Sequence, residues 1–404
     1  MPTHTYLTAA QAAEALGVTR PTLYAYVSRG QLRSEPVPHR PKERRYHRED
    51  IERLQHVKAA RRDPQSAGAR GLHWGGPVLE SGITLIDGGR LYYRGRDAIA
   101  FAESATVEQA AALLWDVPEP SRARLFDQPP LLSTSDLAVV RGTTHDPFGQ
   151  IQVALAIAAS TDVAALDLTP NGIRHAGARI VRLLASVVAR PRPASTPIHD
   201  VIQQAWVPAS RHVGDVIRTA LVLCADHELN VSAFTGRCIA SAGASPYDVV
   251  VAALAALKGF RHGGASARAL ALLAEAGSPT HARAAFAERL QQGGPIPGFG
   301  HPLYPDGDPR ATALLRLARA SGHAAAWAQI KQAWKTGVSV LHQEPNLDFG
   351  LAAITRAYEL PAHAPLVLFA LGRTIGWIAH AMEEYASGAL IRPRARYVGP
   401  PPSR

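Results

Sequence analysis

Residues 225–265 read ADHELNVSAFTGRCIASAGASPYDVVVAALAALKGFRHGGA and combine a strong helical pattern with isolated polar residues. Within this stretch, residues 248–257 repeat apolar side chains at spacings of three and four, as one face of a helix requires. His227 and Arg237 precede that helix, and His262 follows it with two glycines. The stretch therefore predicts a helical region with candidate functional side chains set among its apolar segments.

The same apolar spacing recurs through most of the chain and predicts a mostly α-helical body. The further segments are Val107–Leu114, Ile151–Ala159, Ile173–Val188 and Ala311–Ala320. The chief strand signal is GITLIDGGRLYYRG, residues 82–95, where an Asp87-Gly88 turn suits a short hairpin. Neither a βαβ alternation nor a G-x-G-x-x-G motif after a strand occurs, which argues against a nucleotide-binding parallel sheet.

The composition is that of a folded protein with a sizeable core. Of 404 residues, 47% are hydrophobic and 19% charged, and there are only two cysteines. So few cysteines suit a reducing compartment. The N-terminus has no basic start followed by an apolar stretch. The longest apolar run, Val249–Leu257, is shorter than the roughly 20 residues that span a bilayer. We therefore expect a cytoplasmic protein with no membrane partner.

The net charge of +10 is concentrated near the N-terminus. Residues 1–62 hold 12 Lys/Arg and 6 Asp/Glu, whereas the remaining 342 residues hold 31 and 27. Residues 1–62 thus form a small basic head, and the remaining residues form a nearly neutral body. This distribution indicates that only the head binds a polyanion.

The head has the pattern of two short helices and a basic segment. Ala9, Ala12, Ala13 and Leu16 form an apolar stripe, and Gly17 ends the first helix. The second helix is expected to begin at an N-cap, Thr19, with Pro21 in its first turn, and a third helix is expected from about Arg48. Two helices joined through a turn that contains glycine predict a helix-turn-helix.

This head resembles the DNA-binding domains of the MerR and excisionase families. The matching segments are Thr8–Tyr26, Arg44–Tyr46 and Glu49–Leu54. The resemblance implies a small winged helix-turn-helix domain over residues 1–58. Its groove-facing residues would be Thr19, Arg20, Thr22 and Tyr24, and its phosphate contacts Arg40, Lys42, Arg44 and Arg45. The alternative is a module that only packs on its neighbour or mediates assembly. Residues 59–75 are expected to form a linker, and residues 76–404 the body.

Several candidate chemistries lack their motifs. The chain has no H-E-x-x-H or C-x-x-C, so no metal site is expected, and it has neither a G-x-S-x-G elbow nor a P-loop. Polar residues in glycine-rich or apolar surroundings stand out instead: His227, His262, His301, Arg310, Asp348, Arg373 and Arg392. Arginines grip carboxylates, a desolvated carboxylate is a general base, and neutral histidines donate to oxygens that become negative. The set suits proton abstraction beside a carbonyl, without naming the substrates.

The body resembles citrate synthase from about Gly82 to Gly399. Eight motifs occur in family order: Ile86–Gly95, Ala225–Arg237, Leu257–Ala265, Gly298–His301, Asp308–Ala311, Pro345–Phe349, Gly372–His380 and Ile391–Gly399. The resemblance implies an almost all-α fold with a large and a small helical domain, the small one at roughly residues 230–335. It also implies a homodimer whose subunits share active sites, and no metal or cofactor beyond the acyl-CoA substrate.

The resemblance assigns roles residue by residue. Oxaloacetate would be held by His227, Arg310, Arg373 and Arg392, the last from the partner subunit. Asp348 would remove a methyl proton from acetyl-CoA, His262 would stabilise the enolate, and His301 would polarise the ketone. The loop Pro297, Gly298, Phe299 and Gly300 would contribute to the CoA site. The implied reaction is a Claisen condensation followed by hydrolysis of citryl-CoA to citrate and CoA.

Two departures from the family pattern leave the acyl donor open. Phe260 and Arg261 replace the usual proline and its neighbour before His262, and Pro302 replaces an arginine after His301. A 2-methylcitrate synthase that uses propionyl-CoA is therefore one alternative. A non-catalytic DNA-binding sensor of oxaloacetate or acyl-CoA, built on the same fold, is another.

Overall fold

The structure is a computed structural model that describes residues 6–37, 40–48, 50–51, 54–55, 79–128, 131–189, 191–277, 279–291, 293, 296–395 and 397–401. The chain divides into two compact units, one of residues 81–392 and one of residues 1–80 with 393–404. We call residues 81–392 the body and the described part of residues 6–55 the head. The expected linker, residues 59–75, lies outside the described residues. The division of the body into a large and a small domain stays a prediction.

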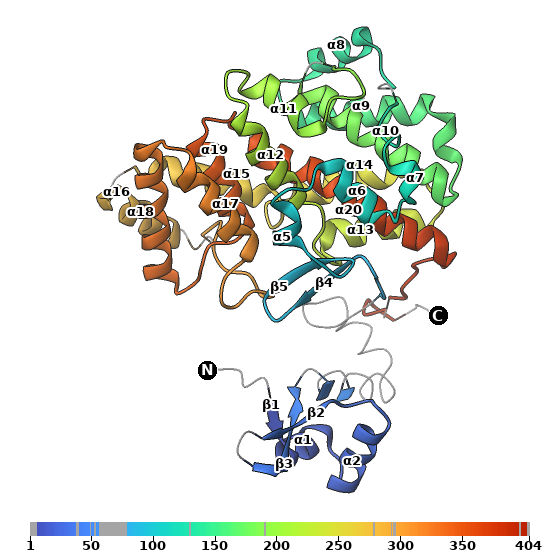
Figure 1. Cartoon of the computed structure of the whole chain (residues 1–404), viewed down its shortest axis with the longest axis vertical. Helices are drawn as coiled ribbons and strands as arrows, with labels where there is room; N and C mark the ends of the chain where they lie inside the picture. Colours follow the sequence, from blue (N-terminus) through green and yellow to red (C-terminus); the bar gives the residue numbers. More distant parts are fainter. Residues whose placement is uncertain are drawn as a thin grey trace. The chain divides into compact units, whose positions relative to one another are not determined.

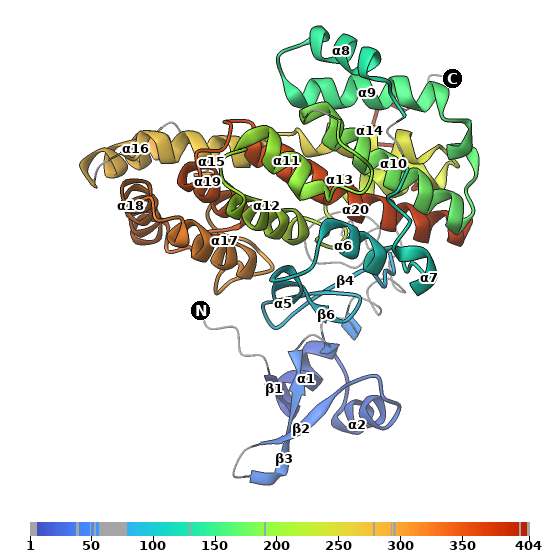
Figure 2. The same cartoon turned by 45° about the horizontal axis from the view of Figure 1, so that its top comes forward.

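The head is a winged helix-turn-helix. Its elements, shown in Figures 1 and 2, are β1 Tyr6–Thr8, α1 Ala9–Leu16, α2 Arg20–Ser28, β2 Ser34–Val37 and β3 Arg40–His47. The strands form one antiparallel sheet in the order β1-β3-β2, and β2 with β3 forms the wing. The predicted head fold is therefore confirmed.

Local sequence sets the ends of the head's helices. Thr8 forms a capping box with Gln11 at the start of α1, and the helix ends at Gly17 in the left-handed conformation. Thr19 is the N-cap of α2, although its side chain makes no capping hydrogen bond and instead lies 3.0 Å from the Thr22 hydroxyl. The head has a core of its own, made of Ala12, Ala13, Leu16, Leu23, Leu32, Tyr46 and Ile51.

The body begins with a small sheet and continues as helices. The strands are β4 Thr84–Asp87, β5 Arg90–Tyr93 and β6 Arg96–Asp97. The helices before the long central helix are α5 Ala98–Ala102, α6 Val107–Leu114, α7 Glu119–Arg122, α8 Thr134–Thr143, α9 Pro147–Thr161, η1 Val163–Leu166, α10 Pro170–Val188, α11 Ile198–Trp206, α12 His212–Leu223, α13 Val231–Ser241, α14 Pro246–Leu257, α15 Gly264–Glu275, α16 Pro279–Gln291, α17 Pro309–Ala320, α18 Ala324–Leu341 and α19 Leu347–Ala357. The last is α20 Ala364–Ser387.

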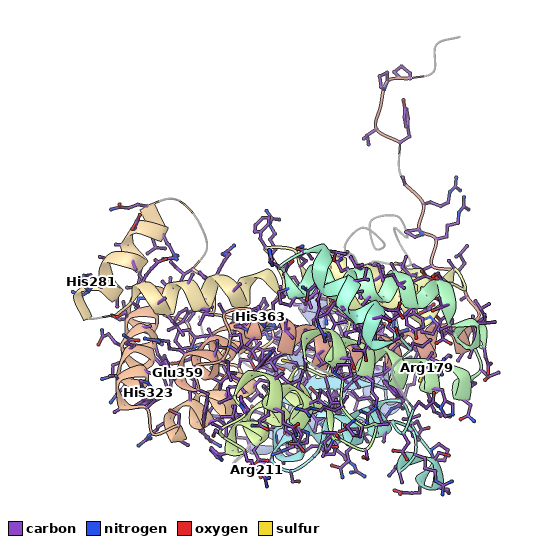
Figure 3. All side chains as sticks on the ribbon, turned by 90° about the horizontal axis from the view of Figure 1, so that it is seen from above. Arg179, Arg211, His281, His323, Glu359 and His363 are labelled. Carbon is purple, nitrogen blue, oxygen red and sulfur yellow. The ribbon has the colours of Figure 1, made fainter. Side chains whose placement is uncertain are left out.

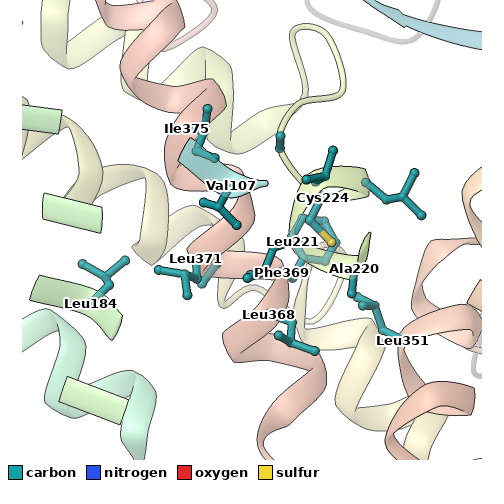
Figure 4. Packing of buried hydrophobic residues seen from close by; sticks show 14 of the residues in the cluster. Val107, Leu184, Ala220, Leu221, Cys224, Leu351, Leu368, Phe369, Leu371 and Ile375 are labelled. Atoms are coloured by element: carbon teal, nitrogen blue, oxygen red, sulfur yellow. The ribbon is translucent and has the colours of Figure 1, made fainter. Parts of the chain in front are cut away.

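Helix α20 runs through the middle of the body, and most other helices are arranged around it (Figure 1). It packs against α6, α10, α12, α13 and α14, while α15 to α19 pack on one another toward one end. Figure 4 shows Leu371 and Ile375 of α20 within the buried cluster that includes Val107, Leu184 and Leu221. One large apolar core therefore joins elements from the whole length of the body, and a small separate cluster of Ala240, Val249 and Ala381 lies beside it.

The observed elements agree with the sequence pattern, with one small shift. Helix α6 covers the predicted Val107–Leu114, because Thr106 and Gln109 form a capping box at its start. In the hairpin Asp87 pairs with Arg90, so the two-residue turn is Gly88-Gly89 rather than the expected Asp87-Gly88. Both turn residues have positive φ, as a type I′ turn requires.

Among the described residues, one helix is long and apolar enough to cross a membrane by length and composition. It is α20, and 89% of the relevant window is buried inside the body. Arg373 and His380 interrupt its apolar residues, so it does not appear in the sequence as one continuous apolar run. Its burial is that of a core helix.

Candidate functional site

The candidate residues of the body lie where four helices begin. His227 precedes α13, His262 precedes α15, Arg310 is in the first turn of α17, and Asp348 is in the first turn of α19. Arg373 comes from the middle of α20.

Side-chain hydrogen bonds join these four helix starts into one site. Ser232 of α13 lies 2.9 Å from His262 Nε2, and the Ser266 hydroxyl of α15 donates to Asp348 Oδ1. Asp308, the N-cap of α17, accepts a hydrogen bond of 3.1 Å from the backbone N–H of Leu347 in α19. Helix N-termini carry partial positive charge, so their convergence suits an anionic ligand.

Two histidines and a tyrosine pack together at this point. His227 Nε2 lies 3.0 Å from the Tyr304 hydroxyl, and the rings of His227 and His301 are 4.9 Å apart between centroids. Burial, followed by the charge of Arg310, lowers the pKa of His227 well below its usual value. The same two causes lower the pKa of His301 to about 4. Both rings are therefore neutral near pH 7.

The hydrogen bonds also indicate where the protons lie. The backbone N–H of Leu303 donates to His301 Nδ1 over 3.2 Å, so the proton of the neutral ring is on Nε2, which becomes a donor. Burial, and then the charge of Arg373, lowers the pKa of His262 to about 4. The Ser232 hydroxyl has one proton to share between Asn230 Oδ1 and His262 Nε2. When His262 Nε2 accepts that proton in a hydrogen bond, Nδ1–H is free to donate.

Asp348 has the properties of a general base near neutral pH. Burial raises its pKa to about 6, against the opposing effects of the Ser266 hydrogen bond and the charges of Arg310 and Arg373. A carboxylate with a pKa close to the working pH is ionised yet basic enough to accept a proton.

Two buried arginines supply positive charge. Arg310 is held by Asp308 through hydrogen bonds of 2.9 Å from Nε and 2.7 Å from Nη2. Arg373 Nε donates to the carbonyl of Cys224 over 2.7 Å, but its Nη2 is buried without a hydrogen-bond partner among the described residues. A buried guanidinium N–H without a partner is costly, which suits a site that receives a carboxylate.

The structure places the last two sets of predicted residues differently: Arg392 has an exposed side chain, whereas the loop Pro297–Gly300 adjoins His301 and contacts Asn346 and Phe349 on either side of Asp348. Arg392 follows α20. The segment of Pro297, Gly298, Phe299 and Gly300 runs beside residues 344–346, where Gly300 N donates to Glu344 O and Asn346 N donates to Gly298 O. The Phe299 ring is buried between Phe286 and Phe349, so this loop offers a ligand its backbone rather than that ring.

Sequence reasoning missed the residues that hold the candidates in place. Ser232, Ser266, Tyr304 and Asp308 each contact a candidate residue through hydrogen bonds. Asp308 carried a local signal, since an Asp before Pro309 and Arg310 is a natural N-cap. The two serines carried none, because their partners are 30 and 82 residues away.

The candidate residues of the head fall into two groups: those at the start of α2 are exposed, and the arginines of the wing make contacts within the head. Thr19, Arg20, Thr22 and Tyr24 are all exposed at the start of α2. In contrast, Arg44 hydrogen-bonds to both the hydroxyl and the carbonyl of Ser34, each over 2.9 Å.

The remaining basic residues of the wing are also partly engaged. Arg45 pairs with Glu35 over 3.1 Å and lies 4.0 Å from the ring centroid of Tyr6. Arg40 pairs with Glu43 over 3.4 Å, and the side chain of Lys42 is outside the described residues. Any phosphate contact by these arginines would be made alongside, or in place of, these contacts.

Comparisons with known proteins agree on both units. The C-terminal domain of citrate synthase, as a family, matches residues 71–394, and a helix-turn-helix domain family matches residues 6–56. Citrate synthase 2 of Bacillus subtilis is 28% identical over 82% of this chain and 96% of its own length. A 2-methylcitrate synthase of Mycobacterium tuberculosis is 31% identical over 76% of this chain and 84% of its own.

Solved structures give the same answer for the fold. The crystal structure of citrate synthase from Thermotoga maritima superposes with a TM-score of 0.70 at 27% identity, covering 82% of this chain and 96% of that one. The helical body and its site therefore define an acyltransferase of the all-α class. The chain belongs to the citrate synthase family, and a helix-turn-helix domain precedes its family domain. Citrate synthases need no cofactor, and their acyl-CoA is a substrate.

Proposed function

We propose that the body condenses acetyl-CoA with oxaloacetate and hydrolyses the resulting citryl-CoA to citrate and CoA. The observation that carries this proposal is the half-buried Asp348, whose pKa is raised to about 6, beside neutral histidines and two buried arginines. This combination suits removal of a weakly acidic proton next to a carbonyl and attack on an anionic acceptor.

In the first step Asp348 takes a proton from the methyl group of acetyl-CoA. The electron pair of that C–H bond moves into the enolate, whose oxygen accepts a hydrogen bond from His262 Nδ1–H. A neutral donor in a dry site stabilises the developing charge because no solvent must reorganise around it.

In the second step the enolate carbon attacks the ketone carbon of oxaloacetate. His301 passes its Nε2 proton to the ketone oxygen, which becomes the hydroxyl of citryl-CoA, and the proton that Asp348 removed from the methyl group returns to His301 through water, so that both residues end in their starting states. His227, Arg310, Arg373 and the partner subunit's Arg392 hold the carboxylates of oxaloacetate. Water then cleaves the thioester, and the CoA thiol leaves past the backbone of Pro297 to Gly300.

A homodimer with shared active sites is part of this proposal, because the family resemblance assigns Arg392 to the active site of the partner subunit; the exposure of its side chain supports that role. A cytoplasmic location is supported by the two cysteines, Cys224 and Cys238, both of which are free.

A second candidate is 2-methylcitrate synthase activity with propionyl-CoA. It is favoured by the 31% identity to a relative with that name and by the two departures around His262 and His301. Steady-state kcat/KM for acetyl-CoA and propionyl-CoA, measured by CoA-thiol release with oxaloacetate, decides between them. A ratio above 1 in favour of acetyl-CoA supports our assignment, and a ratio below 1 supports the second candidate.

For the head we propose DNA binding through the exposed start of α2. Arg20 and Tyr24 are exposed there, and the first 62 residues carry an excess of positive charge. Binding should weaken steeply with salt, because contacts to phosphates release counterions. Fluorescence anisotropy against genomic fragments at 50 and 200 mM salt tests this. Affinity that does not respond to Arg20→Ala with Tyr24→Ala would contradict a contact through α2, and a wild-type protein that binds no fragment at 50 mM salt would indicate an assembly role instead.

A further inference from the structure

The segment of residues 224–227 lies along α20 and contacts it residue by residue. Arg373 Nε donates to the carbonyl of Cys224 over 2.7 Å. One turn further along the helix, the backbone N–H of Gly376 donates to the carbonyl of Ala225 over 3.0 Å. Two successive residues of the segment are thus held by positions three apart on one face of the helix.

The third contact in this series joins two fully buried side chains. His380, four residues beyond Gly376, places Nε2 3.2 Å from Asp226 Oδ1. Neither Asp226 nor His380 is accessible to solvent. The next residue in the chain is His227, whose ring faces Tyr304 and His301 in the candidate active site.

The close approach of the two elements depends on a glycine. A Cβ atom at Gly376 would lie 2.3 Å from Asp226 Oδ1 and 2.4 Å from the carbonyl oxygen of Ala225. Contacts that short are not tolerated, so any side chain at this position would push the segment off the helix.

His380 is held from its other side by a buried arginine. Arg237 Nε donates to His380 Nδ1 over 3.0 Å, so the proton of the neutral ring is on Nε2 and faces Asp226. Arg237 is fixed in turn by Glu384, over 3.1 Å, and by Glu383. The row from Arg237 through His380 to Asp226 therefore consists of one hydrogen bond and one polar contact of 3.2 Å, and within the described residues neither His380 Nε2 nor Asp226 Oδ1 has a hydrogen-bond partner.

The same row ends beside a candidate substrate-binding arginine. Burial raises the pKa of Asp226, whereas His380 and Arg373 lower it. The lowering effects are together the larger, so the pKa of Asp226 lies below its ordinary value. Asp226 is therefore ionised in the interior, close to the guanidinium of Arg373.

We propose that Asp226, His380 and Arg237 are positioning residues for the oxaloacetate site. They hold residues 224–227 against α20 and thereby set His227 and Arg373 at a fixed separation. The proposal rests on the proposed function, which assigns those two residues to oxaloacetate. None of the three positioning residues is required to touch the substrate.

The test is direct binding of oxaloacetate to the full-length protein, measured by titration calorimetry without an acyl donor. Asp226→Asn keeps the shape of the side chain and removes its charge. The matched control is Asp162→Asn, because Asp162 is also buried and accepts hydrogen bonds from Arg179 over 2.8 Å and Tyr247 over 2.9 Å. Arg179 lies at the opposite end of the body from His281 and His323 (Figure 3).

We expect Asp226→Asn to weaken oxaloacetate binding by about 10-fold or more, the factor that one charge-assisted hydrogen bond typically contributes. Asp162→Asn should change this affinity by less than about 2-fold, even though both variants lower the thermal midpoint. At saturating oxaloacetate, KM for acetyl-CoA in Asp226→Asn should stay within about 2-fold of wild type.

Two variants at His380 test the contact with Arg237 and the contact with Asp226 separately. They also replace the Asp226→Asn experiment if that variant does not fold. His380→Gln can still extend an amide N–H to Asp226, whereas His380→Asn keeps an acceptor for Arg237 but is too short to reach Asp226. We expect the Gln variant to retain more oxaloacetate affinity than the Asn variant.

Three results would overturn the proposal: unchanged oxaloacetate affinity in Asp226→Asn, equal losses in Asp226→Asn and Asp162→Asn, or equal affinity in the two His380 variants. A wild-type protein that does not bind oxaloacetate would instead contradict the proposed function itself, and the premise of this inference with it.

Discussion

The Ser266 hydroxyl at the start of α15 donates a hydrogen bond to Oδ1 of Asp348 at the start of α19. The contact holds the proposed base by one oxygen and leaves the other for a substrate proton. It also lowers the pKa of Asp348, whereas burial raises it to a net value of about 6. The two effects together set the pH range in which Asp348 is an ionised base.

Removing that hydrogen bond should shift the pH dependence of the reaction. In Ser266→Ala the ionised form of Asp348 loses a donor, so its pKa rises above about 6 and the acid limb of kcat/KM moves to higher pH. We expect a shift of about one pH unit, read from pH–rate profiles between pH 5 and 9. The control is Ser160→Ala, since the Ser160 hydroxyl donates only to the carbonyl of Ile157. An unshifted profile in Ser266→Ala would contradict this role.

Acidification should destabilise the folded protein through its buried histidines. The folded-state pKa values of His262 and His301 are lowered to about 4 from 6.5, so the unfolded state binds protons more readily. Their contribution to stability is complete above pH 6.5 and is lost as pH falls toward 4. The titration of Asp348 changes the stability in the opposite direction, because its raised pKa favours the folded state as pH falls below about 6.

This linkage can be measured with a single variant. Urea unfolding at pH 7 and pH 4.5 should give a free energy of unfolding that is lower at pH 4.5 by about 2–4 kcal/mol, from 1.36 kcal/mol per pKa unit. In His301→Asn the difference should shrink by about 2–3 kcal/mol, because one titrating group is removed. A difference that is the same in the wild type and the variant would argue against a neutral, buried His301.

Asp308 should be essential for stability because it neutralises a buried cation. It is 1% exposed and pairs with Arg310, which is 2% exposed. Asp308→Asn would leave the buried charge of Arg310 without its partner, at a cost of about 3–5 kcal/mol in the free energy of unfolding. Asp308→Asn combined with Arg310→Gln should recover part of that loss without recovering activity. Chemical unfolding of both variants checks this, and additive losses in the double variant would contradict the pairing.

The head should unfold independently of the body, because it has its own core. Leu23 is fully buried there, and Leu23→Ala should destabilise the head by about 2–4 kcal/mol. Differential scanning calorimetry should then show one transition moved to lower temperature and the transition of the body unchanged, with catalytic rates unaffected. A parallel shift of both transitions would show that the two units fold as one.

The sequence predicted the elements whose signals are local. Helix α6 has its capping box and its apolar stripe within ten residues, and α1 has both its cap and its terminating glycine. The hairpin turn was misplaced by one residue because Asp-Gly and Gly-Gly both suit a type I′ turn, and only the strand register separates them.

The pairings that complete the site were beyond such reasoning, even where a residue such as Arg237 was itself a candidate. Ser266 meets Asp348 across 82 residues, and Arg237 meets His380 across 143. Those pairs exist because α15 packs on α19 and α13 packs on α20, which is decided by the whole core rather than by any local pattern. The positions of His262, His301 and Asp348 were predicted through the family resemblance, and their roles stay predictions until they are tested.

The most direct test of the account is CoA-thiol release in wild type and Asp348→Asn, with oxaloacetate affinity measured on both proteins. We predict that the wild type releases CoA with oxaloacetate and acetyl-CoA. In Asp348→Asn the rate should fall by about 1,000-fold or more, while oxaloacetate affinity stays within about 3-fold, because only the proton-abstracting base is lost. Turnover by Asp348→Asn at near wild-type rate, or no turnover by a wild-type protein that binds oxaloacetate tightly, would contradict the account. The second result would favour a DNA-binding sensor built on the same fold.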